Sequence, residues 1–422
     1  MNKNNYNGLK ERRIFAENCY VSNDDIHSGF NNNDLIIGGS GSGKTGGYVI
    51  PNIRKANGSV VVADTKSLLY HKLKDEMIAK GFKVKVLDFA NMECSNGYNP
   101  LDAIRENPLK HSVDRYSNRD IVSIARALCP ESFEKDPFWT DSARTVLTFL
   151  VAFTMEALIP EEHTLMSVLE LYRVLNNEKE RDMIDKWCEK HPESFASKKY
   201  RMFRGIMEVD RTWSCITQVV AESLDIFEFG EMTRIIENTE EKIDIRALGH
   251  EKTILFLNVS DTNRSVDRIV NLFYTQVMQL LCDEADSMED GRLPVSVRII
   301  LDDFAANVYI SDFDKLISVI RSRNICTSVI LQNITQLNSM YSEGQASTIM
   351  SNCDHMLYLG GQDLDTANYI SIRANKPVER ILSMPFEKAY FIERGKLAKL
   401  VEKVKPYATL EEGKEAYEEE YI

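Results

Sequence analysis

Short apolar segments recur along the chain and alternate with segments whose apolar residues are spaced three or four positions apart. The short segments are rich in Val, Ile and Leu, as expected for parallel strands that are buried on both faces. The segments at 68–80 and 266–285 have helical spacing. This alternation predicts an α/β fold with a mainly parallel sheet. The expected strands are 34–37, 58–64, 83–89, 252–259, 295–304, 325–332 and 355–361.

The pattern changes between 115 and 239, where helical spacing dominates and strand signals become scarce. We therefore expect an all-α domain inserted into the α/β domain, which would occupy 31–114 and 240–406. Residues 1–30 look like an irregular lead-in. Residues 407–422 form an acidic tail that is either solvated or a docking segment.

The composition restricts how the protein can meet nucleic acid. Of the 422 residues, 43% are hydrophobic, which is enough to form a large core. The formal net charge is −13, whereas a protein that coats nucleic acid with its outer surface is normally basic. Contact with DNA must then be local, as in a pore or groove. The eight cysteines include no C-x-x-C pair and the seven histidines no H-E-x-x-H motif, so we expect reduced thiols and no zinc site.

The most apolar helical segment, 145–159, contains Glu156 and ends before Pro160. It is shorter than the roughly 20 apolar residues that a membrane-spanning helix needs. The first residues of the chain are polar and charged, so no signal peptide is expected. We therefore expect a cytoplasmic protein that sits at the inner face of the membrane through a separate membrane-spanning partner.

The strongest motif is a glycine-rich segment that follows the expected strand at 34–37 and precedes a helical segment. It matches G-x-x-x-x-G-K-[ST] at every position, the pattern of a phosphate-binding P-loop. Its backbone N–H groups would surround the phosphates of ATP, while the lysine reaches the β and γ phosphates and the threonine binds Mg²⁺. ATP and Mg²⁺ are thus the expected cofactors, held by Gly38, Gly39, Ser40, Gly41, Ser42, Gly43, Lys44 and Thr45.

A second motif is the apolar strand RIIL followed by Asp302 and Asp303. An apolar strand that ends in acidic residues is the Walker B pattern of P-loop ATPases. Asp302 would hold Mg²⁺ directly or through water, and Asp303 would polarise the attacking water. Many strands end in acidic turns, so this motif alone is a weak signal. Its combination with the P-loop favours a role in Mg²⁺ binding and hydrolysis.

Five further polar residues allow two interpretations each. Gln332 ends a strand, where a side chain faces the ligand crevice of a parallel sheet, and it either positions water or is an ordinary strand-end residue. Asp64 and Lys66 either face the nucleotide or form a solvated turn. Arg321 and Arg323 either act on the ATP of a neighbouring subunit or are solvated residues at a helix end, which the helix dipole favours.

With these motifs in place, the sequence resembles the TraG/TraD-type coupling proteins of type IV secretion and conjugation, which are P-loop ATPases related to the FtsK and HerA class. The resemblance covers most of the chain, from about 34 to 405. The matching stretches are GGSGSGKTGGYVIPNI, VVVADTKSLLYHKL, GYNPLDAI, DPFWTDSARTVLTFLV, LFLNVSDTNRSVDRIVNLFYTQV, IILDDFAANVYISDFDKLISVIRSRNICTSVILQNITQLNSMY and IMSNCDHMLYLGGQDLDTANYIS.

The resemblance implies a RecA-like nucleotide-binding domain that carries an all-α domain and assembles as a homo-hexameric ring with ATP between subunits. It implies recruitment of a relaxase–DNA complex or an effector protein to a membrane secretion channel, with single-stranded DNA in the ring pore. The family's P-loop roles carry over to Gly43, Lys44 and Thr45, its metal-binding acid to Asp302, and its strand-end glutamine to Gln332. Its inter-subunit arginine corresponds to Arg321 or Arg323.

The sequence departs from the family pattern at three points. Asp303 stands where the family usually has glutamate, which puts the identity of the catalytic base in doubt. Lys66, Ser67 and Leu68 stand where a lysine-glycine-glutamate motif is common. The N-terminal membrane helices usual in the family are not visible in this sequence.

Three functions remain open from the sequence. The first is an ATP-driven motor that couples DNA or protein substrates to a secretion channel. The second, motivated by Asp303, is a recruitment adaptor that binds ATP but turns over little. The third is a cytosolic DNA translocase, against which the DPFW segment and the helical insertion argue.

Overall fold

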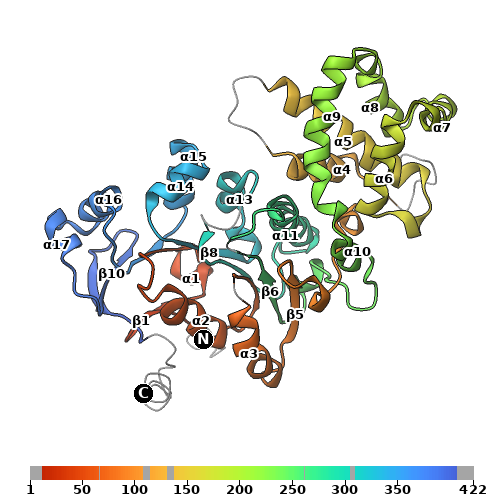
Figure 1. Cartoon of the computed structure of the whole chain (residues 1–422). Helices are drawn as coiled ribbons and strands as arrows, with labels where there is room; N and C mark the ends of the chain where they lie inside the picture. Colours follow the sequence, from red (N-terminus) through yellow and green to blue (C-terminus); the bar gives the residue numbers. More distant parts are fainter. Residues whose placement is uncertain are drawn as a thin grey trace. The chain divides into compact units, whose positions relative to one another are not determined.

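The computed structural model describes residues 12–65, 67–107, 115–130, 137–260, 262–304 and 309–405. The chain divides into two units (Figure 1). The α/β unit consists of Met1–Val86, Asp244–Asp261 and Met278–Ile422, and the helical unit consists of Leu87–Ile243 and Thr262–Val277. Helix α11 (Asp267–Ser287) contributes its first half to the helical unit and its second half to the α/β unit.

The α/β unit is built on a nine-stranded sheet in the order β11-β10-β9-β3-β8-β7-β4-β6-β5 within the described residues. The five central pairings, from β9 through β3, β8, β7 and β4 to β6, are all parallel, whereas β10 and β11 add an antiparallel edge. The expected α/β fold with a mainly parallel sheet is therefore confirmed. The strands are β3 (Asp34–Ile37), β4 (Ser59–Asp64), β5 (Lys83–Asp88), β6 (Thr253–Asn258), β7 (Val297–Leu301), β8 (Ile325–Leu331), β9 (His355–Tyr358), β10 (Lys388–Glu393) and β11 (Lys399–Glu402).

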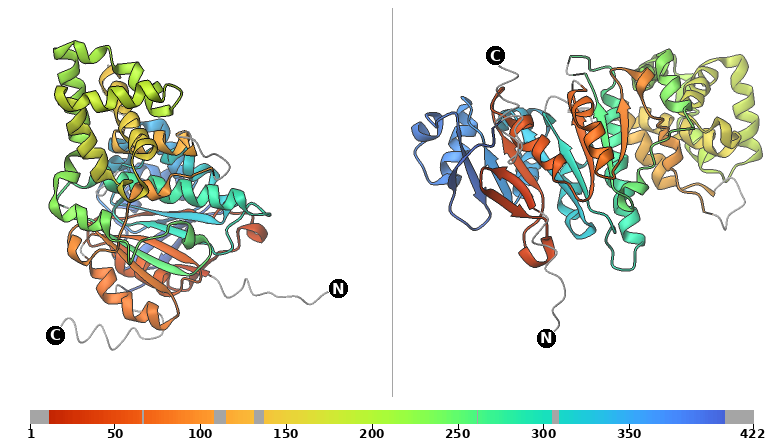
Figure 2. Two further views of the ribbon diagram at one scale, coloured as in Figure 1. Left: turned by 90° about the vertical axis from the view of Figure 1, so that its right-hand side faces the viewer. Right: turned by 90° about the horizontal axis from the view of Figure 1, so that it is seen from below.

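Helices cover both faces of this sheet, which explains why its strands read as continuous apolar runs. In Figures 1 and 2, α2 and α3 lie on one face and α13 to α16 on the other. Every residue of β4, β6 and β8 is buried. The helices are α2 (Ile50–Arg54), α3 (Leu68–Ala79), α13 (Phe313–Val319), α14 (Ile334–Met340), α15 (Glu343–Ser351), α16 (Leu364–Ala374) and α17 (Val378–Leu382).

The segment expected to be an irregular lead-in contains a hairpin of β1 (Arg12–Ala16) and β2 (Cys19–Ser22), followed by α1 (Asp25–Ser28). Phe15 packs in the sheet core, with its ring centroid 5.1 Å from that of Phe391. Arg13 is also buried. A hydropathy pattern treats arginine as a surface residue even where it is buried, and for this reason β1 was not predicted.

The side chain of Arg13 belongs to a buried charge cluster around Asp34, the first residue of β3. Arg13 forms an ion pair with Asp34, its Nε lying 2.9 Å from Oδ2, and it donates a hydrogen bond through Nη2 to Oδ1 at 3.1 Å. Arg298 on β7 donates through Nη1 at 3.0 Å. The hydroxyl of Tyr48, beyond the P-loop, donates at 2.6 Å. One carboxylate thus joins the N-terminal hairpin, two strands and the segment that follows the P-loop.

The helical unit has its own core around α5, where the ring of Phe149 contacts those of Tyr200 and Phe203 at centroid distances of 5.1 and 5.4 Å. Its described residues between 115 and 239 form helices joined by turns. Its longer helices are α4 (Asn118–Leu128), α5 (Phe138–Ala157), α6 (Leu165–Asn176), α7 (Glu178–Lys190), α8 (Phe195–Phe203), α9 (Asp210–Leu224) and α10 (Gly230–Glu237).

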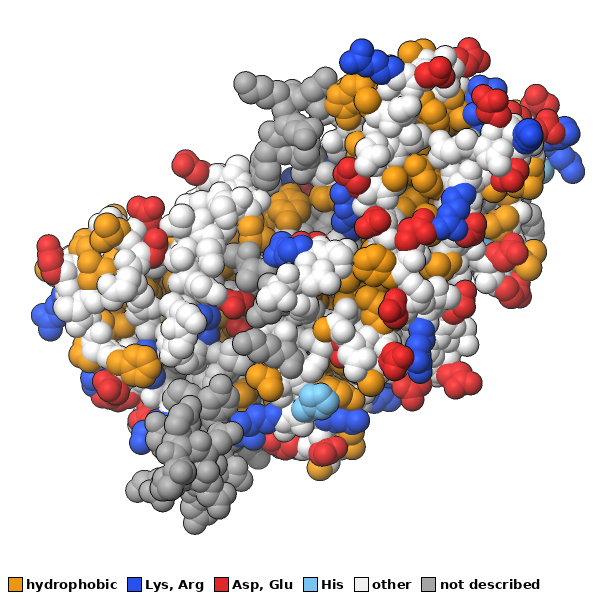
Figure 3. All heavy atoms as spheres, in the orientation of Figure 1, with side chains coloured by type: hydrophobic (Ala, Val, Ile, Leu, Met, Phe, Trp, Pro, Cys, Tyr) orange, Lys and Arg blue, Asp and Glu red, His pale blue; other side chains and the backbone are white. Residues whose placement is uncertain are grey.

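Acidic and basic side chains are interspersed on the face of this unit that Figure 3 displays. Several of them form ion pairs, such as Lys186 with Asp182 and Lys242 with Asp102. The visible face therefore carries no continuous basic patch. Across the described ranges of both units, no helix combines the length and the apolar character that crossing a membrane requires.

The Asp34 cluster generates a stability prediction. Asp34→Asn removes the only carboxylate that Arg13 and Arg298 contact among the described residues. It leaves the buried guanidinium of Arg13 and the largely buried guanidinium of Arg298 without a counter-charge. Breaking a buried ion pair from one side costs about 3–5 kcal/mol. We expect a loss of that size in the free energy of unfolding, measured by urea denaturation. The exposed Asp365→Asn serves as a control within about 0.5 kcal/mol of wild type, and equal stability of both variants would contradict the role of the cluster.

Candidate functional site

The glycine-rich segment forms a tight loop directly after β3. Gly41 and Gly43 have φ values of +71° and +94°, in the left-handed region that glycine adopts without strain. A Cβ atom at Gly38 would lie 2.4 Å from Ser42 Oγ and 2.8 Å from Leu359 Cβ. The loop therefore depends on glycine for its conformation and for its close packing.

Two neighbouring strands fix the position of the loop. The Gly38 amide donates to the Leu331 carbonyl at the end of β8 at 3.0 Å, and the Gly39 amide donates to the Gly360 carbonyl after β9 at 2.9 Å. Gly360 itself has a φ of +95°. The Gly-Gly pair after β9 was not predicted to be part of the site, although two glycines at the carboxyl end of a parallel strand are a detectable signal.

The residues of the loop present donors for an anion. Lys44 is buried, and its Nζ donates to the carbonyls of Gly38 at 2.8 Å and Gly39 at 3.1 Å. The Ser42 hydroxyl is buried and makes no hydrogen bond with any residue that the structure describes. After Lys44 the chain forms a π-helical turn (Thr45–Val49) that continues into α2. π-Helical turns within helices occur often at functional sites.

Thr45 and Asp302 meet across the sheet, although they are 257 positions apart in the sequence. The Thr45 hydroxyl donates to Asp302 Oδ2 at 2.7 Å. Burial raises the pKa of Asp302 to about 6; the hydrogen bond from Thr45 and the charge of Lys44 act in the opposite direction, and the neighbouring Asp303 adds to the increase. A hydroxyl and a carboxylate are oxygen ligands that a hard divalent cation prefers.

No group of three or more metal-ligating His, Cys, Asp or Glu side chains exists within the described ranges. A cation at Thr45 and Asp302 would therefore take its other ligands from water or from a bound anion.

Asp303 and Gln332 also lie together. Gln332 Nε2 donates to the two carboxylate oxygens of Asp303 at 3.1 and 3.3 Å. Asp303 has a φ of +51°, in the left-handed region. Aspartate enters this region more readily than longer side chains do. The backbone at this position thus gives a physical reason for Asp303 where the family usually has glutamate.

Asp64 ends β4, and one of its carboxylate oxygens accepts a hydrogen bond from the amide of Tyr70 in the first turns of α3 at 2.9 Å. This contact uses part of the carboxylate to close the turn between strand and helix. Lys66 lies outside the described residues.

Arg321 and Arg323 are not brought to the P-loop of their own chain. Both belong to a 3-10 turn that precedes β8, at the amino end of the strand, whereas the P-loop lies at the carboxyl end of the sheet. Arg323 binds Asp286 through Nε at 2.8 Å and Nη2 at 2.9 Å, and Arg321 donates to the backbone carbonyl of Asp25 at 3.2 Å. Any role in nucleotide chemistry would have to be directed at a neighbouring copy of the chain.

Lys403 is a residue of this site that sequence reasoning missed. Its Nζ donates to the Ser42 carbonyl in the P-loop at 3.2 Å and lies 4.6 Å from the centre of the exposed Phe386 ring. Burial lowers the pKa of Lys403 to about 8, and Glu387 acts in the opposite direction. The separation of 361 positions between Lys403 and Ser42 left no local signal for this contact.

Comparison with known proteins places this geometry in a family. The family described as type IV secretory system conjugative DNA transfer matches residues 3–375. No curated protein matches the sequence at a significant level.

Solved structures share the fold. The bacterial conjugative coupling protein TrwBdeltaN70 in its unbound form has 14% sequence identity and a TM-score of 0.70, with 94% of this chain and 89% of that chain covered. TrwB in complex with ADP and Mg²⁺ has 14% identity and a TM-score of 0.68, with 90% and 87% covered. VirB4 of Thermoanaerobacter pseudethanolicus has 12% identity and a TM-score of 0.52, with 90% of each chain covered. The resemblance found in the sequence is thus confirmed, and the chain belongs to the type IV secretory system conjugative DNA transfer family.

Proposed function

We propose that this chain is a Mg²⁺-dependent ATPase that acts as a coupling protein, recruiting and driving DNA (a relaxase–DNA complex) or protein substrates to a type IV secretion channel. The observation that carries the proposal is the Thr45–Asp302 contact beside a complete P-loop with a buried lysine. The nucleotide complexes of TrwB, one with ADP and Mg²⁺ and one with a non-hydrolysable ATP analogue, support the choice of ligand.

The donor set fits ATP and Mg²⁺. A Cβ at Gly38 would collide with Ser42 and Leu359, so glycine keeps the phosphate cradle open. Lys44 and the Ser42 hydroxyl supply donors for phosphate oxygens, and Thr45 with Asp302 supplies two oxygen ligands for the metal. When bound, ATP with its Mg²⁺ supplies an electrophilic phosphorus and the cation that neutralises developing charge.

The other residues orient and move protons around this centre. Asp303 accepts a proton from the attacking water, and Gln332 holds its carboxylate through the two hydrogen bonds at 3.1 and 3.3 Å. Lys403 adds a positive charge behind the P-loop backbone. Asp64 stabilises the neighbouring turn.

In the active state the chain assembles as a homo-hexamer, with single-stranded DNA in the pore and Arg321 or Arg323 facing the ATP of a neighbour. It receives a relaxase or effector protein and is held at the inner face of the membrane by a membrane-spanning channel partner. Cell fractionation with and without that partner tests the placement, since only co-expression should move the chain to the membrane fraction.

Lys44→Ala should abolish ATP hydrolysis, because the ammonium neutralises phosphate charge and contributes charge-assisted hydrogen bonds. Phosphate release measures the rate, and Lys376→Ala, which removes an exposed lysine of the same unit, should keep the wild-type rate. Turnover that survives in Lys44→Ala would refute the assigned site.

The same variant tests the ring. Mixed with Arg321→Ala or Arg323→Ala subunits, Lys44→Ala should regain activity, because a mixed interface pairs an intact P-loop with an intact arginine. Arginine fingers contribute on the order of 10³–10⁵ in rate. Mixed hexamers that form but stay inactive would assign both arginines a purely structural role.

Asp302→Asn should lose Mg²⁺-dependent hydrolysis yet stabilise the nucleotide-free chain at pH 8. Burial raises the folded-state pKa of Asp302 from 3.8 to about 6, so wild type loses stability as the pH rises through this window and the carboxylate becomes charged. Asparagine removes this loss, on the order of 1–3 kcal/mol. Melting temperatures in metal-free buffer should differ at pH 8 and converge below pH 4; a variant that is less stable at pH 8 would contradict the assignment.

Asp303→Asn should slow hydrolysis by about 10²–10⁴-fold while ATP affinity is preserved, because only the proton acceptor is lost. Gln332→Ala should give a smaller loss, since the carboxylate remains but is no longer held. Single-turnover hydrolysis with a parallel binding titration separates the two effects. A wild-type rate in Asp303→Asn would move the base elsewhere.

A further inference from the structure

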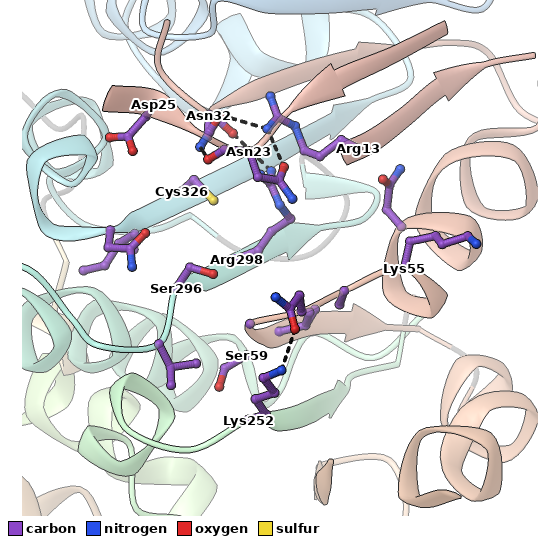
Figure 4. Close-up of a pocket in the computed structure, with 18 of the residues that line it drawn as sticks. Arg13, Asn23, Asp25, Asn32, Lys55, Ser59, Lys252, Ser296, Arg298 and Cys326 are labelled. Carbon is purple, nitrogen blue, oxygen red and sulfur yellow. Dashed lines mark hydrogen bonds between the residues drawn. The ribbon is translucent and has the colours of Figure 1, made fainter. Parts of the chain in front are cut away.

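A second cavity opens at the amino ends of the strands whose carboxyl ends carry the P-loop site. Its volume is about 300 Å³, and the starts of β4 and β8 and the approach to β7 line it, together with the hairpin and the end of α2 (Figure 4). On β7, Arg298 lies in this cavity whereas Asp302 follows the same strand at the other edge. The separation is four residues, or roughly 13 Å of strand, so the cavity is distinct from the nucleotide site of the same chain.

The lining of this cavity is strongly cationic in a chain whose net charge is −13. In Figure 4, Arg298 lies between Arg13 and Lys252. The lining contains one carboxylate, that of Asp25. The cationic side chains in the lining are Arg12, Arg13, Lys55, Lys252, Arg298 and Arg321.

That carboxylate is already neutralised from outside the lining. Arg292 donates to the two oxygens of Asp25 through Nη2 at 2.9 Å and Nη1 at 3.3 Å. Asp25 therefore does little to balance the cavity cations, and the positive charge of the lining remains.

Two of these lining cations, Arg13 and Arg298, belong to the charge cluster at Asp34, which carries an excess of positive charge. Arg13 and Arg298 share the single carboxylate of Asp34. Burial lowers the pKa of the adjacent His355 to about 4, so this imidazole is neutral at pH 7. Two guanidinium groups and one carboxylate leave a net charge of +1 in a region where unbalanced charge is costly.

Several of the lining cations have N–H donors that make no hydrogen bond with the described residues. Arg298 makes its three hydrogen bonds through Nη1, and its Nε and Nη2 donate to no residue in the described ranges. The side chains of Arg12 and Lys55 have no ion pair or hydrogen bond with any residue that the structure describes. An anion in the cavity could therefore bind to donors of Arg12, Lys55 and Arg298 that no described residue uses.

We propose that this cavity binds a phosphate group of a small molecule. Arginine forks and lysine ammonium groups match phosphate oxygens in geometry and charge. A volume of about 300 Å³ suits a phosphate or pyrophosphate moiety with a small substituent. The phosphate comes either from a soluble metabolite or nucleotide or from a phospholipid headgroup, and both sources present the same chemistry.

The test uses the full-length Lys44→Ala chain, in which the P-loop no longer competes for the probe. Calorimetric titration with inorganic pyrophosphate should show one site per chain, weakened by salt. Adding Arg12→Gln or Lys55→Gln should weaken binding about tenfold each, the loss expected for a charge-assisted hydrogen bond. Lys376→Gln, an exposed lysine outside the lining, should leave it unchanged.

Two further measurements make the outcome decisive. The wild-type chain saturated with a non-hydrolysable ATP analogue should bind pyrophosphate in the same way, which guards against misfolding of Lys44→Ala.

Sedimentation with phosphatidylglycerol vesicles identifies the source of the phosphate. Vesicle binding that depends on Arg12 and Lys55 assigns the headgroup, and its absence assigns a soluble phosphate. Equal affinity for chloride and pyrophosphate would mean an adventitious ion only and overturn the proposal, as would pyrophosphate binding that the cavity substitutions do not change. The proposal is independent of ATP hydrolysis.

Discussion

The buried carboxylate of Asp34 joins the segments on which the position of the P-loop depends. It lies at the start of β3, the strand that leads directly into the P-loop, and accepts hydrogen bonds from Arg13, Tyr48 and Arg298. Tyr48 belongs to the π-helical turn that follows the loop. The segments before and after the P-loop are therefore held to one point, and burial of Asp34 and Arg13 strengthens the interaction.

The strands of the α/β unit carry chemically different residues at their two ends. On β3, Asp34 at the amino end is followed by Gly38 beyond the carboxyl end; on β7, Arg298 is followed by Asp302. Parallel strands align all carboxyl ends at one edge and all amino ends at the other. Asp302 and the P-loop thus lie at one edge and the cationic cavity at the other, although the sequence mixes their residues.

Two residues at the P-loop edge of the sheet, Asp302 and Asp303, have features that lower the stability of the folded chain. The raised pKa of Asp302 reflects a buried carboxylate, whose charged form is destabilised by the loss of solvation. Asp303 adds a left-handed backbone conformation, which is uncommon outside glycine. Such features persist where the surrounding fold is rigid enough to impose them, and here the fully buried strands β4 and β8 provide that rigidity.

The sequence by itself determined those features that depend on local pattern. Continuous apolar runs identified the parallel strands because both faces of the sheet are covered, and the spacing around Lys44 identified the P-loop because its conformation requires glycine at fixed positions. The acids after β7 followed from the Walker B pattern of an apolar strand that ends in acidic residues, and Gln332 from the rule that the carboxyl ends of parallel strands meet. Gln332 was predicted to lie at the same edge of the sheet as Asp303. The hydrogen bond between the two side chains agrees with that prediction.

The tertiary structure alone decided which distant side chains touch. The hairpin with Arg13 was missed because its buried charge is balanced by Asp34, a partner that no local pattern reveals. The contact of Lys403 with the P-loop depends on how the last strands pack beside β9, and the cationic cavity on strand starts that are scattered along the chain. Hydropathy and spacing report the environment of a residue relative to its neighbours in sequence, whereas charge compensation and ligand cavities arise from segments that only the folded sheet brings together.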